Sequence, residues 1–201
     1  MRIILIFTII ITYFMSNSNK NIDSPTTENN KVKSDSTRTM LYSFLEQGKG
    51  KWRVQDDVVM GGRSDSQLKI TENNHAHFYG RVSLENDGGF CSIHQTMEKN
   101  PYRIPDKSKA FLLRLKGDGK DYNFRVRTKN GRHSYGFTFS TKGDGYWESI
   151  SIPFNMMEAS YHGEPVEVPN YAGENVMEMQ LLIGNQKEET FEIFIESIEI
   201  I

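Results

Sequence analysis

Val58-Val59-Met60-Gly61-Gly62-Arg63-Ser64 and Val82-Ser83-Leu84-Glu85-Asn86-Asp87-Gly88-Gly89-Phe90 are the two segments that decide the fold of this chain. Each places a Gly-Gly pair beside large apolar residues. A glycine pair lets the backbone adopt a positive φ or approach another segment closely, so such loops impose strict geometry. We therefore expect the stretch from Trp52 to Phe90 to form one shared structural feature, with Met60 and Phe90 as buried anchors around which the glycines turn.

On both sides of this stretch the sequence consists of short alternating runs separated by turn residues. In the segment 122–127 (Tyr-Asn-Phe-Arg-Val-Arg), apolar side chains fall on one face of a strand and polar side chains on the other. The segments 117–119 and 143–145 both read Gly-Asp-Gly, which is a strong turn signal. A short helical turn is expected within 154–161. The expected strands are 40–45, 51–55, 66–71, 75–83, 89–95, 109–116, 122–129, 133–140, 147–152, 177–183 and 190–200. Many short strands at this spacing predict an all-β, antiparallel jelly-roll sandwich over residues 40–201.

Composition narrows the class of protein further. The chain has 201 residues, with 24 Lys and Arg against 26 Asp and Glu and a formal net charge of −2. Such a balance is unlike that of a nucleic-acid-binding protein, so no nucleic-acid partner is expected. Cys91 is the single cysteine, which excludes an intrachain disulfide and a cysteine-clustered metal site.

The N-terminal residues 1–18 contain one early arginine and a nearly unbroken apolar run, which is typical of a signal peptide or an N-terminal anchor. Residues 19–39 are almost entirely polar and predict a flexible linker. We expect the protein to be exported, periplasmic or extracellular, or tethered to a membrane by an uncleaved N-terminus. The single arginine disfavours a mitochondrial transit peptide.

Carboxylates next to the glycine pairs are the first candidates for chemistry. If the two loops meet, Asp57 and Glu85, with Asp56 and Asp87 nearby, could form the acid pair of a glycoside hydrolase or ligate calcium. Asp and Asn beside glycine turns more often bond to the local backbone, and that interpretation is preferred here. A glycoside hydrolase is kept as the third hypothesis, after the two binding roles given below.

Cysteine and histidine chemistry is weakly indicated. Cys91 and His94 lie three apart on an expected strand, so their side chains point to opposite faces, and Cys91 is better explained as a core residue. His75 and His77 share a strand face, but no third metal ligand stands out. The sequence therefore predicts no catalytic residue, no metal and no cofactor.

Two sets of side chains are candidates for binding. Arg125 and Arg127, with Arg114 on an earlier strand, are expected to form a basic strand face that could contact a ligand, although a solvated face is the simpler interpretation. Trp52, Tyr146 and Trp147 could stack on sugar rings if they are exposed, and core packing is the alternative.

The two glycine-bearing segments also carry a family resemblance. Trp52-Arg53-Val54, Asp57, 59–62 and Ser64 resemble the opening signature of the complex I intermediate-associated protein family. Phe78, Gly80, 82–86 and 88–90 resemble its second signature, and the similarity continues to the end of the chain. The residues of the structural signature are Trp52, Met60, Gly61, Gly62, Gly88, Gly89 and Phe90.

The resemblance implies a galactose-binding-domain-like jelly-roll sandwich and a non-enzymatic role as a binding or assembly factor. We expect a protein partner, or a carbohydrate if the domain is an exported carbohydrate-binding module. Contact with a membrane is expected only through the N-terminal segment. The residues expected to bind are Asp57, Arg63, Glu85, Asn86, Arg125, Arg127, Tyr146 and Trp147.

Overall fold

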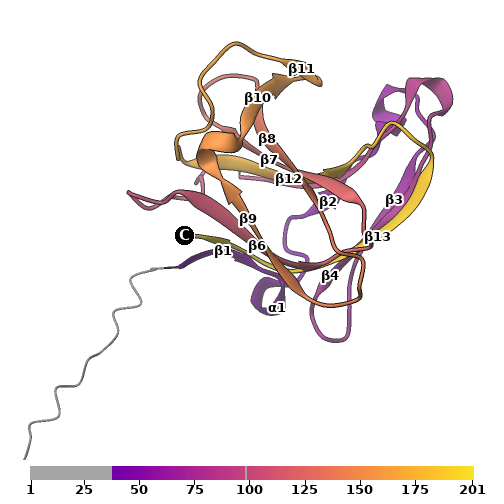
Figure 1. Ribbon diagram of the computed structural model, residues 1–201, viewed down its shortest axis with the longest axis horizontal. Helices are drawn as coiled ribbons and strands as arrows, with labels where there is room; N and C mark the ends of the chain where they lie inside the picture. The colour runs from indigo at the N-terminus through magenta and orange to yellow at the C-terminus, as the bar shows by residue number, and fades with distance from the viewer. Residues whose placement is uncertain (1–37, 98) are drawn as a thin grey trace, which may run out of the picture. The chain divides into compact units, whose positions relative to one another are not determined.

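Residues 38–97 and 99–201 form two antiparallel β-sheets that pack face to face in the computed structural model (Figure 1). This arrangement confirms the all-β sandwich predicted from the alternating sequence. The expected signal or anchor segment, and all but the last two residues of the expected linker, lie outside the described residues. Within the part of the chain that is described, no helix has the length and apolar character needed to cross a membrane.

The first sheet is built around its long C-terminal strand. Its strands follow the order β3-β4-β13-β6-β9, and β1 also pairs with β13. Their bounds are β1 (Thr39–Ser43), β3 (Asp65–Ile70), β4 (Ala76–Val82), β6 (Ala110–Lys116), β9 (Glu148–Pro153) and β13 (Glu189–Ile200).

The second sheet has the order β11-β10-β8-β7-β12-β5-β2. Its bounds are β2 (Arg53–Val54), β5 (Cys91–Thr96), β7 (Asp121–Thr128), β8 (Ser134–Ser140), β10 (Glu158–Tyr161), β11 (Glu164–Pro165) and β12 (Val176–Ile183). Each of the expected strands is present with its ends shifted by a few residues. Strands β10 and β11 were not predicted.

Four short helical segments connect these strands. They are α1 (Phe44–Gln47), η1 (Asp57–Met60), η2 (Glu85–Asp87) and η3 (Phe154–Met156). The helical turn expected within 154–161 is η3, whereas residues 158–161 form strand β10. The single turn α1 occupies the end of a segment predicted as strand, because the Ser43 hydroxyl accepts a hydrogen bond from the Glu46 N–H and caps a helix there.

The core lies between the two sheets and is filled by the inward residues of the alternating strands. Phe78 and Ile193 of the first sheet and Phe124 and Leu181 of the second are almost completely buried. The rings of Phe111 on β6 and Phe124 on β7 meet edge to face at 5.3 Å, which ties the layers together. Burial of each such side chain contributes roughly 1.5–3 kcal/mol, so the inward faces hold the sandwich closed.

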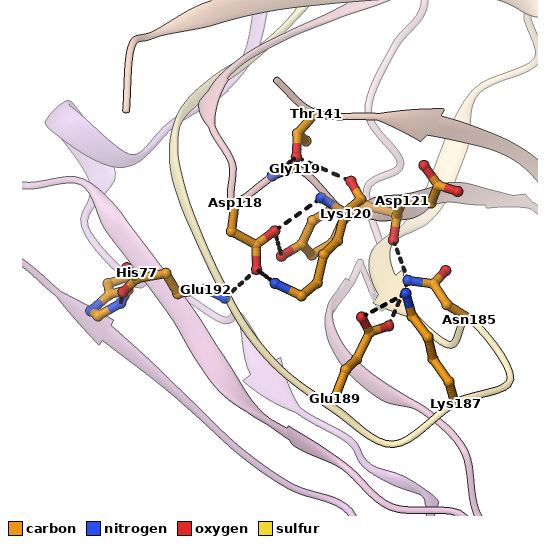
Figure 2. A network of polar contacts seen from close by, with 11 residues as sticks. His77, Asp118, Gly119, Lys120, Asp121, Thr141, Asn185, Lys187, Glu189 and Glu192 are labelled. Carbon is orange, nitrogen blue, oxygen red and sulfur yellow. Dashed lines mark hydrogen bonds and ion pairs between the residues drawn. The ribbon is translucent and has the colours of Figure 1, made fainter. Parts of the chain in front are cut away.

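The Gly-Asp-Gly turn at 117–119 carries the chain from the first sheet to the second, and its aspartate bonds to both (Figure 2). Asp118 Oδ2 accepts a hydrogen bond from the Glu192 N–H of β13 at 2.9 Å and pairs with Lys120 Nζ at 2.7 Å. Asp118 Oδ1 accepts from the hydroxyl of Tyr122 on β7 at 3.0 Å. Because the Tyr122 side chain is buried, this bond satisfies a hydroxyl that has little access to water.

Candidate functional site

The two glycine-bearing loops meet at the carboxylate of Asp57, which is fully buried. Asp57 Oδ1 accepts a hydrogen bond from the Ser64 N–H at 3.0 Å, and Oδ2 accepts from the Ser64 hydroxyl at 2.5 Å. Oδ2 also accepts from the N–H groups of Gly89 and Phe90, at 2.6 and 3.2 Å. Burial alone would raise the pKa of Asp57, but these donors outweigh it and hold the pKa below its usual value. The shared feature of the two loops is therefore a buried anionic junction.

Two of the four glycines are required because the Asp57 carboxylate occupies the space of a side chain. A Cβ added to Gly62 would collide with Asp57 Oδ1, and one added to Gly88 would lie 2.6 Å from Oδ2. No such contact distance is found for real Cβ atoms, so a larger residue at either position would displace the carboxylate or the loop.

The other two glycines allow the backbone to turn. Gly61 has φ +97° and ends η1, and Gly89 has φ +144°. The glycines thus turn the chain closely, as predicted, but the buried residue that they enclose is Asp57. The expectation that Met60 is a buried anchor is wrong, because its side chain is 65% exposed. Phe90 is partly buried.

The apolar side chains of these loops instead form the rim of a depression on the outer face of the second sheet. Val59 and Met60 of η1 and Leu84 before η2 are all exposed. Together with Phe90 and Leu182 they line a hollow of about 750 Å³. The segments that identify the fold from sequence therefore also shape a surface cavity.

The floor next to this hollow is a row of side chains that the strand register places side by side. Arg53 of β2 is opposite His94 of β5, which is opposite Gln180 of β12. Gln180 is opposite Arg125 of β7, and Arg125 is opposite Gly136 of β8. A second hollow of about 470 Å³ lies over this row, and Arg125 and Gln180 line both hollows. We refer to the two hollows together as the groove.

Gly136 leaves room for the arginine at the centre of this row. A Cβ at Gly136 would lie 2.9 Å from Asn123 Oδ1 and 3.2 Å from Arg125 Cγ. Arg125 Nε donates a hydrogen bond to Asn123 Oδ1 at 2.7 Å, which holds the Nε end of the guanidinium group in place. Burial lowers the pKa of Arg125, since the surrounding residues keep water from its charge.

A carboxylate occupies the neighbouring row. Glu178 Oε2 accepts hydrogen bonds from Arg127 Nη2 at 2.7 Å and from the Thr96 hydroxyl at 2.8 Å, and Glu178 Oε1 lies 3.7 Å from His94 Nδ1. Burial alone would raise the pKa of Glu178, but the contacts with His94, Arg127 and Thr96 lower it to about 2. Glu178 is therefore a fixed negative charge that is fully engaged by its neighbours.

The hairpin that sequence reasoning missed, β10–β11, contributes to the wall of the groove. Tyr161 pairs with Glu164, so His162 and Gly163 form its two-residue loop, and both have positive φ. His162 and Gly163 line the groove. A two-residue loop that ends in Gly is a hairpin signal, but His at the first position and Pro165 in the second strand concealed it.

Five of the remaining residues expected to bind lie at two separate places. Arg125 and Arg127 share the outer face of β7, as predicted, whereas Arg114 lies on β6 of the first sheet and does not belong to this face. Arg63 and Glu85 form an exposed ion pair at 3.3 Å between the two loops. The Asn86 amide donates to the Gly61 carbonyl oxygen at 3.2 Å, so it joins the loops as well.

The aromatic residues proposed as a sugar platform lie outside the groove, and one of them, Trp52, is buried in the core. The ring of Trp147 lies 4.5 Å from the ring of His75 in a tilted arrangement and is close to Lys116, on the outer face of the first sheet. Tyr146 precedes it in the loop before β9 and is 75% exposed. Neither residue lines the groove.

The alternatives for catalysis and metal binding find little support in the described geometry. Cys91 lies in the core, where burial raises the pKa of its thiol well above the usual range. His77 stacks on Phe194, and its Nε2 contacts Glu192 at 3.0 Å (Figure 2). Within residues 38–97 and 99–201, no group of three or more His, Cys, Asp or Glu residues has the arrangement of a metal site.

Fold and site together define a β-sandwich with a groove across the outer face of one sheet, rimmed by two glycine-bearing loops. Residues 43–195 match the model of the family "Complex I intermediate-associated protein 30 (CIA30)", and the chain belongs to this family. The family predicted from the two signatures is thereby confirmed.

The chain is also similar to two individual proteins. It is 31% identical over 150 residues to "Complex I intermediate-associated protein 30, mitochondrial" of Mus musculus, and this match covers 64% of the chain and 45% of the mouse protein. The chain thus spans less than half the length of that relative. It is 24% identical over 169 residues to an uncharacterised protein of Schizosaccharomyces pombe, which covers 75% of the chain and 77% of the yeast protein.

Two of the solved structures with a similar fold are carbohydrate-binding modules. The Family 11 module of the cellulosomal cellulase Lic26A-Cel5E of Clostridium thermocellum superposes with a TM-score of 0.58 at 15% identity, covering 82% of this chain and 94% of the module. The Clostridium thermocellum Family 11 module in complex with a beta-1,3-1,4-mixed-linked tetrasaccharide gives a TM-score of 0.59 at 15% identity, with 82% and 95% covered. At this identity the likeness establishes the galactose-binding-like fold alone.

Proposed function

We propose that this protein is a non-catalytic binding domain that holds a protein partner in the groove, in a role like that of an assembly factor. The observation that carries the proposal is the position of the two family signatures. They build the rim of the groove through the Asp57 junction, and they present Val59, Met60 and Leu84 to solvent. A cluster of exposed apolar side chains next to polar ones is typical of a protein-binding surface.

The state of the acidic residues supports a role without catalysis. The Asp57 carboxylate is enclosed by backbone donors and has no free oxygen to offer a substrate. Glu85 is exposed and pairs with Arg63. Glu178, which lies in the groove, has its pKa lowered to about 2 and is a poor proton donor or acceptor near neutral pH.

The name of the mouse relative supports the kind of partner. That protein is described as associated with an intermediate of complex I. For this chain we propose the corresponding general role, which is binding to a component of a larger protein assembly before that assembly is complete.

The test is a photo-crosslinking experiment in cells of the natural source with the full chain. A photoreactive amino acid replaces Val59 at the rim or, as the matched control, Tyr146 outside the groove, since the two positions are 70% and 75% exposed. We expect a discrete protein adduct from position 59 and none from position 146. Equal adducts from both positions, or no protein adduct together with retardation in gels that contain neutral polysaccharides, would contradict the proposal and favour a carbohydrate-binding module.

A further inference from the structure

The second hollow of the groove, which lies over the row from Arg53 to Gly136 and is called the polar hollow below, has an excess of positive charge that the described residues do not balance. Four arginines line it, namely Arg53, Arg125, Arg127 and Arg132, and its single acidic residue is Glu178. Glu178 is already engaged by Arg127 at 2.7 Å. Within residues 38–97 and 99–201, no carboxylate lies within ion-pair distance of the other three arginines.

Arg125 is the member of this set that is best placed to bind an anion. It is partly buried at the centre of the sheet, and of its donors only Nε has a partner among the described residues, the Asn123 amide oxygen. A guanidinium shielded from water gains more from a bidentate carboxylate than an exposed one does, because the ion pair is less screened. His94 Nε2, in the same hollow, is also buried without a hydrogen-bond partner.

The neighbouring hollow determines which kind of anion fits. Arg125, Gln180, Gln55 and His162 line both hollows, so a ligand bound to Arg125 extends directly into the apolar one. That hollow is lined by Met60, Leu84 and other apolar side chains, with one acidic residue, Asp87. Apolar side chains gain free energy by burying other apolar groups, whereas the hydroxyl-rich surface of a sugar chain gives them little to bury.

We infer that the groove binds an extended acidic peptide segment of a protein partner, with an Asp or Glu carboxylate on Arg125 and a large apolar side chain in the adjoining hollow. This inference rests on the proposed protein-binding function and names the chemistry of the partner. The side-chain amides of Gln55 and Gln180 lie between the two subsites, where they can bond to the peptide backbone of the ligand.

The test uses a phage-displayed library of random dodecapeptides, selected on the immobilised full chain. We expect the retained peptides to be enriched in an acidic residue close to a large apolar residue. Binding of a selected synthetic peptide is then measured by fluorescence anisotropy and compared with that of its Glu→Gln or Asp→Asn counterpart. The charged peptide should bind about tenfold more tightly or better, and its affinity should fall as salt is raised.

Variants of the protein assign the site. Arg125→Gln should weaken binding of the selected peptide at least about tenfold, whereas the matched change Arg114→Gln, on the outer face of the first sheet, should alter it less than about twofold. Thermal melting checks that Arg125→Gln is folded. If it is not, Arg53→Gln tests the same hollow from an exposed position, with a smaller loss expected.

The outcomes separate this inference from the proposed function. The acidic-peptide assignment would be overturned if the selected peptides lacked acidic residues or if Arg125→Gln left the affinity unchanged. It would also be overturned if the protein bound the acidic polysaccharide polygalacturonate in preference to the selected peptides. If the adduct from position 59 persists at the same time in the Arg125→Gln chain, protein binding stands and only the ligand chemistry fails. If the otherwise unchanged chain with the photoreactive residue at position 59 gave no protein adduct, the proposed function itself would be contradicted.

Discussion

Replacement of Asp57 by alanine tests whether the buried junction holds the two glycine-bearing loops together. The substitution removes the acceptor of four hydrogen bonds, from the Ser64 N–H and hydroxyl and from the N–H groups of Gly89 and Phe90. The Ser64 hydroxyl retains a partner, because it also lies 3.3 Å from the Ser83 carbonyl oxygen. Three backbone N–H groups then lose their acceptor.

The magnitude follows from how well water can replace that acceptor. Leaving a buried N–H unsatisfied costs about 1–3 kcal/mol, and this full cost applies to buried Ser64. Gly89 and Phe90 are partly exposed, so each contributes less, roughly 0.5–1.5 kcal/mol. Relief of the desolvated charge offsets part of the total. We therefore expect Asp57→Ala to lower the free energy of unfolding by about 3 kcal/mol.

Urea unfolding of the full chain, followed by circular dichroism, measures this loss. With a slope of about 2 kcal/mol/M, the midpoint should shift down by about 1.5 M. Hydrogen exchange should accelerate most at the amides of Ser64, Gly89 and Phe90. The matched control is Asp65→Ala, because Asp65 is an exposed residue of β3, and its expected change is within about 0.5 kcal/mol. If the two variants lost the same small amount, the junction would not carry the stability assigned to it.

Three further predictions concern stability. Gly62→Ala should destabilise the protein more than Gly61→Ala, because the new methyl group at position 62 collides with Asp57, whereas at position 61 it enters open space and costs only the roughly 1–2 kcal/mol of the positive φ. In urea unfolding, the double variant Gly62→Ala with Asp57→Ala should lose less stability than the sum of the two single variants. Strict additivity would argue against the collision. Asp118→Ala should lower the free energy of unfolding by about 2–4 kcal/mol, because it leaves the buried Tyr122 hydroxyl without its hydrogen-bond acceptor. The matched change Asp144→Ala, in the other Gly-Asp-Gly turn, should cost under about 1 kcal/mol, because Asp144 accepts only the exposed Tyr146 N–H. Equal melting temperatures for the two variants would contradict the role of Asp118. The folded-state pKa of Glu178 is lowered from 4.5 to about 2, so its charged contacts stabilise the fold fully above a pH of about 4.5, and this stabilisation is lost as the pH falls toward 2. The difference in stability between the wild-type chain and Glu178→Gln, measured by chemical denaturation, should therefore shrink over this acid range. A constant difference would count against the ion-pair assignment.

The sequence predicted the sandwich because its strands carry a period of two that the core requires. In β7, the inward Tyr122, Phe124 and Val126 and the outward Arg125 and Arg127 follow the alternation without exception. Strands β10 and β11 were not predicted because they lack this period of two. They are short and mostly exposed, so no buried face imposes an alternating pattern on them.

The candidate site could be predicted only in part. The outward direction of Arg125 follows from strand alternation, but its neighbours Gln180 and His94 come from strands far apart in the sequence, and only the register brings them together. The exposure of Met60 could not be predicted either. A loop has no period that tells which residue points inward, and in η1 the buried position is taken by Asp57.

The rim and the floor of the groove are determined by different physical requirements. Asp57, Gly62 and Gly88 depend on one another, because the carboxylate fills the space that the two glycines leave open. A change at any one of them disturbs the loops, so this part behaves as a fixed element of the fold. Arg125, in contrast, stands on the outward face of a strand, where the sandwich itself requires only a side chain that tolerates partial exposure. The fold therefore constrains the shape of the groove much more tightly than its charge. For this reason the signatures identify the family, whereas in the proposed acidic-peptide binding the arginines of the floor select the partner.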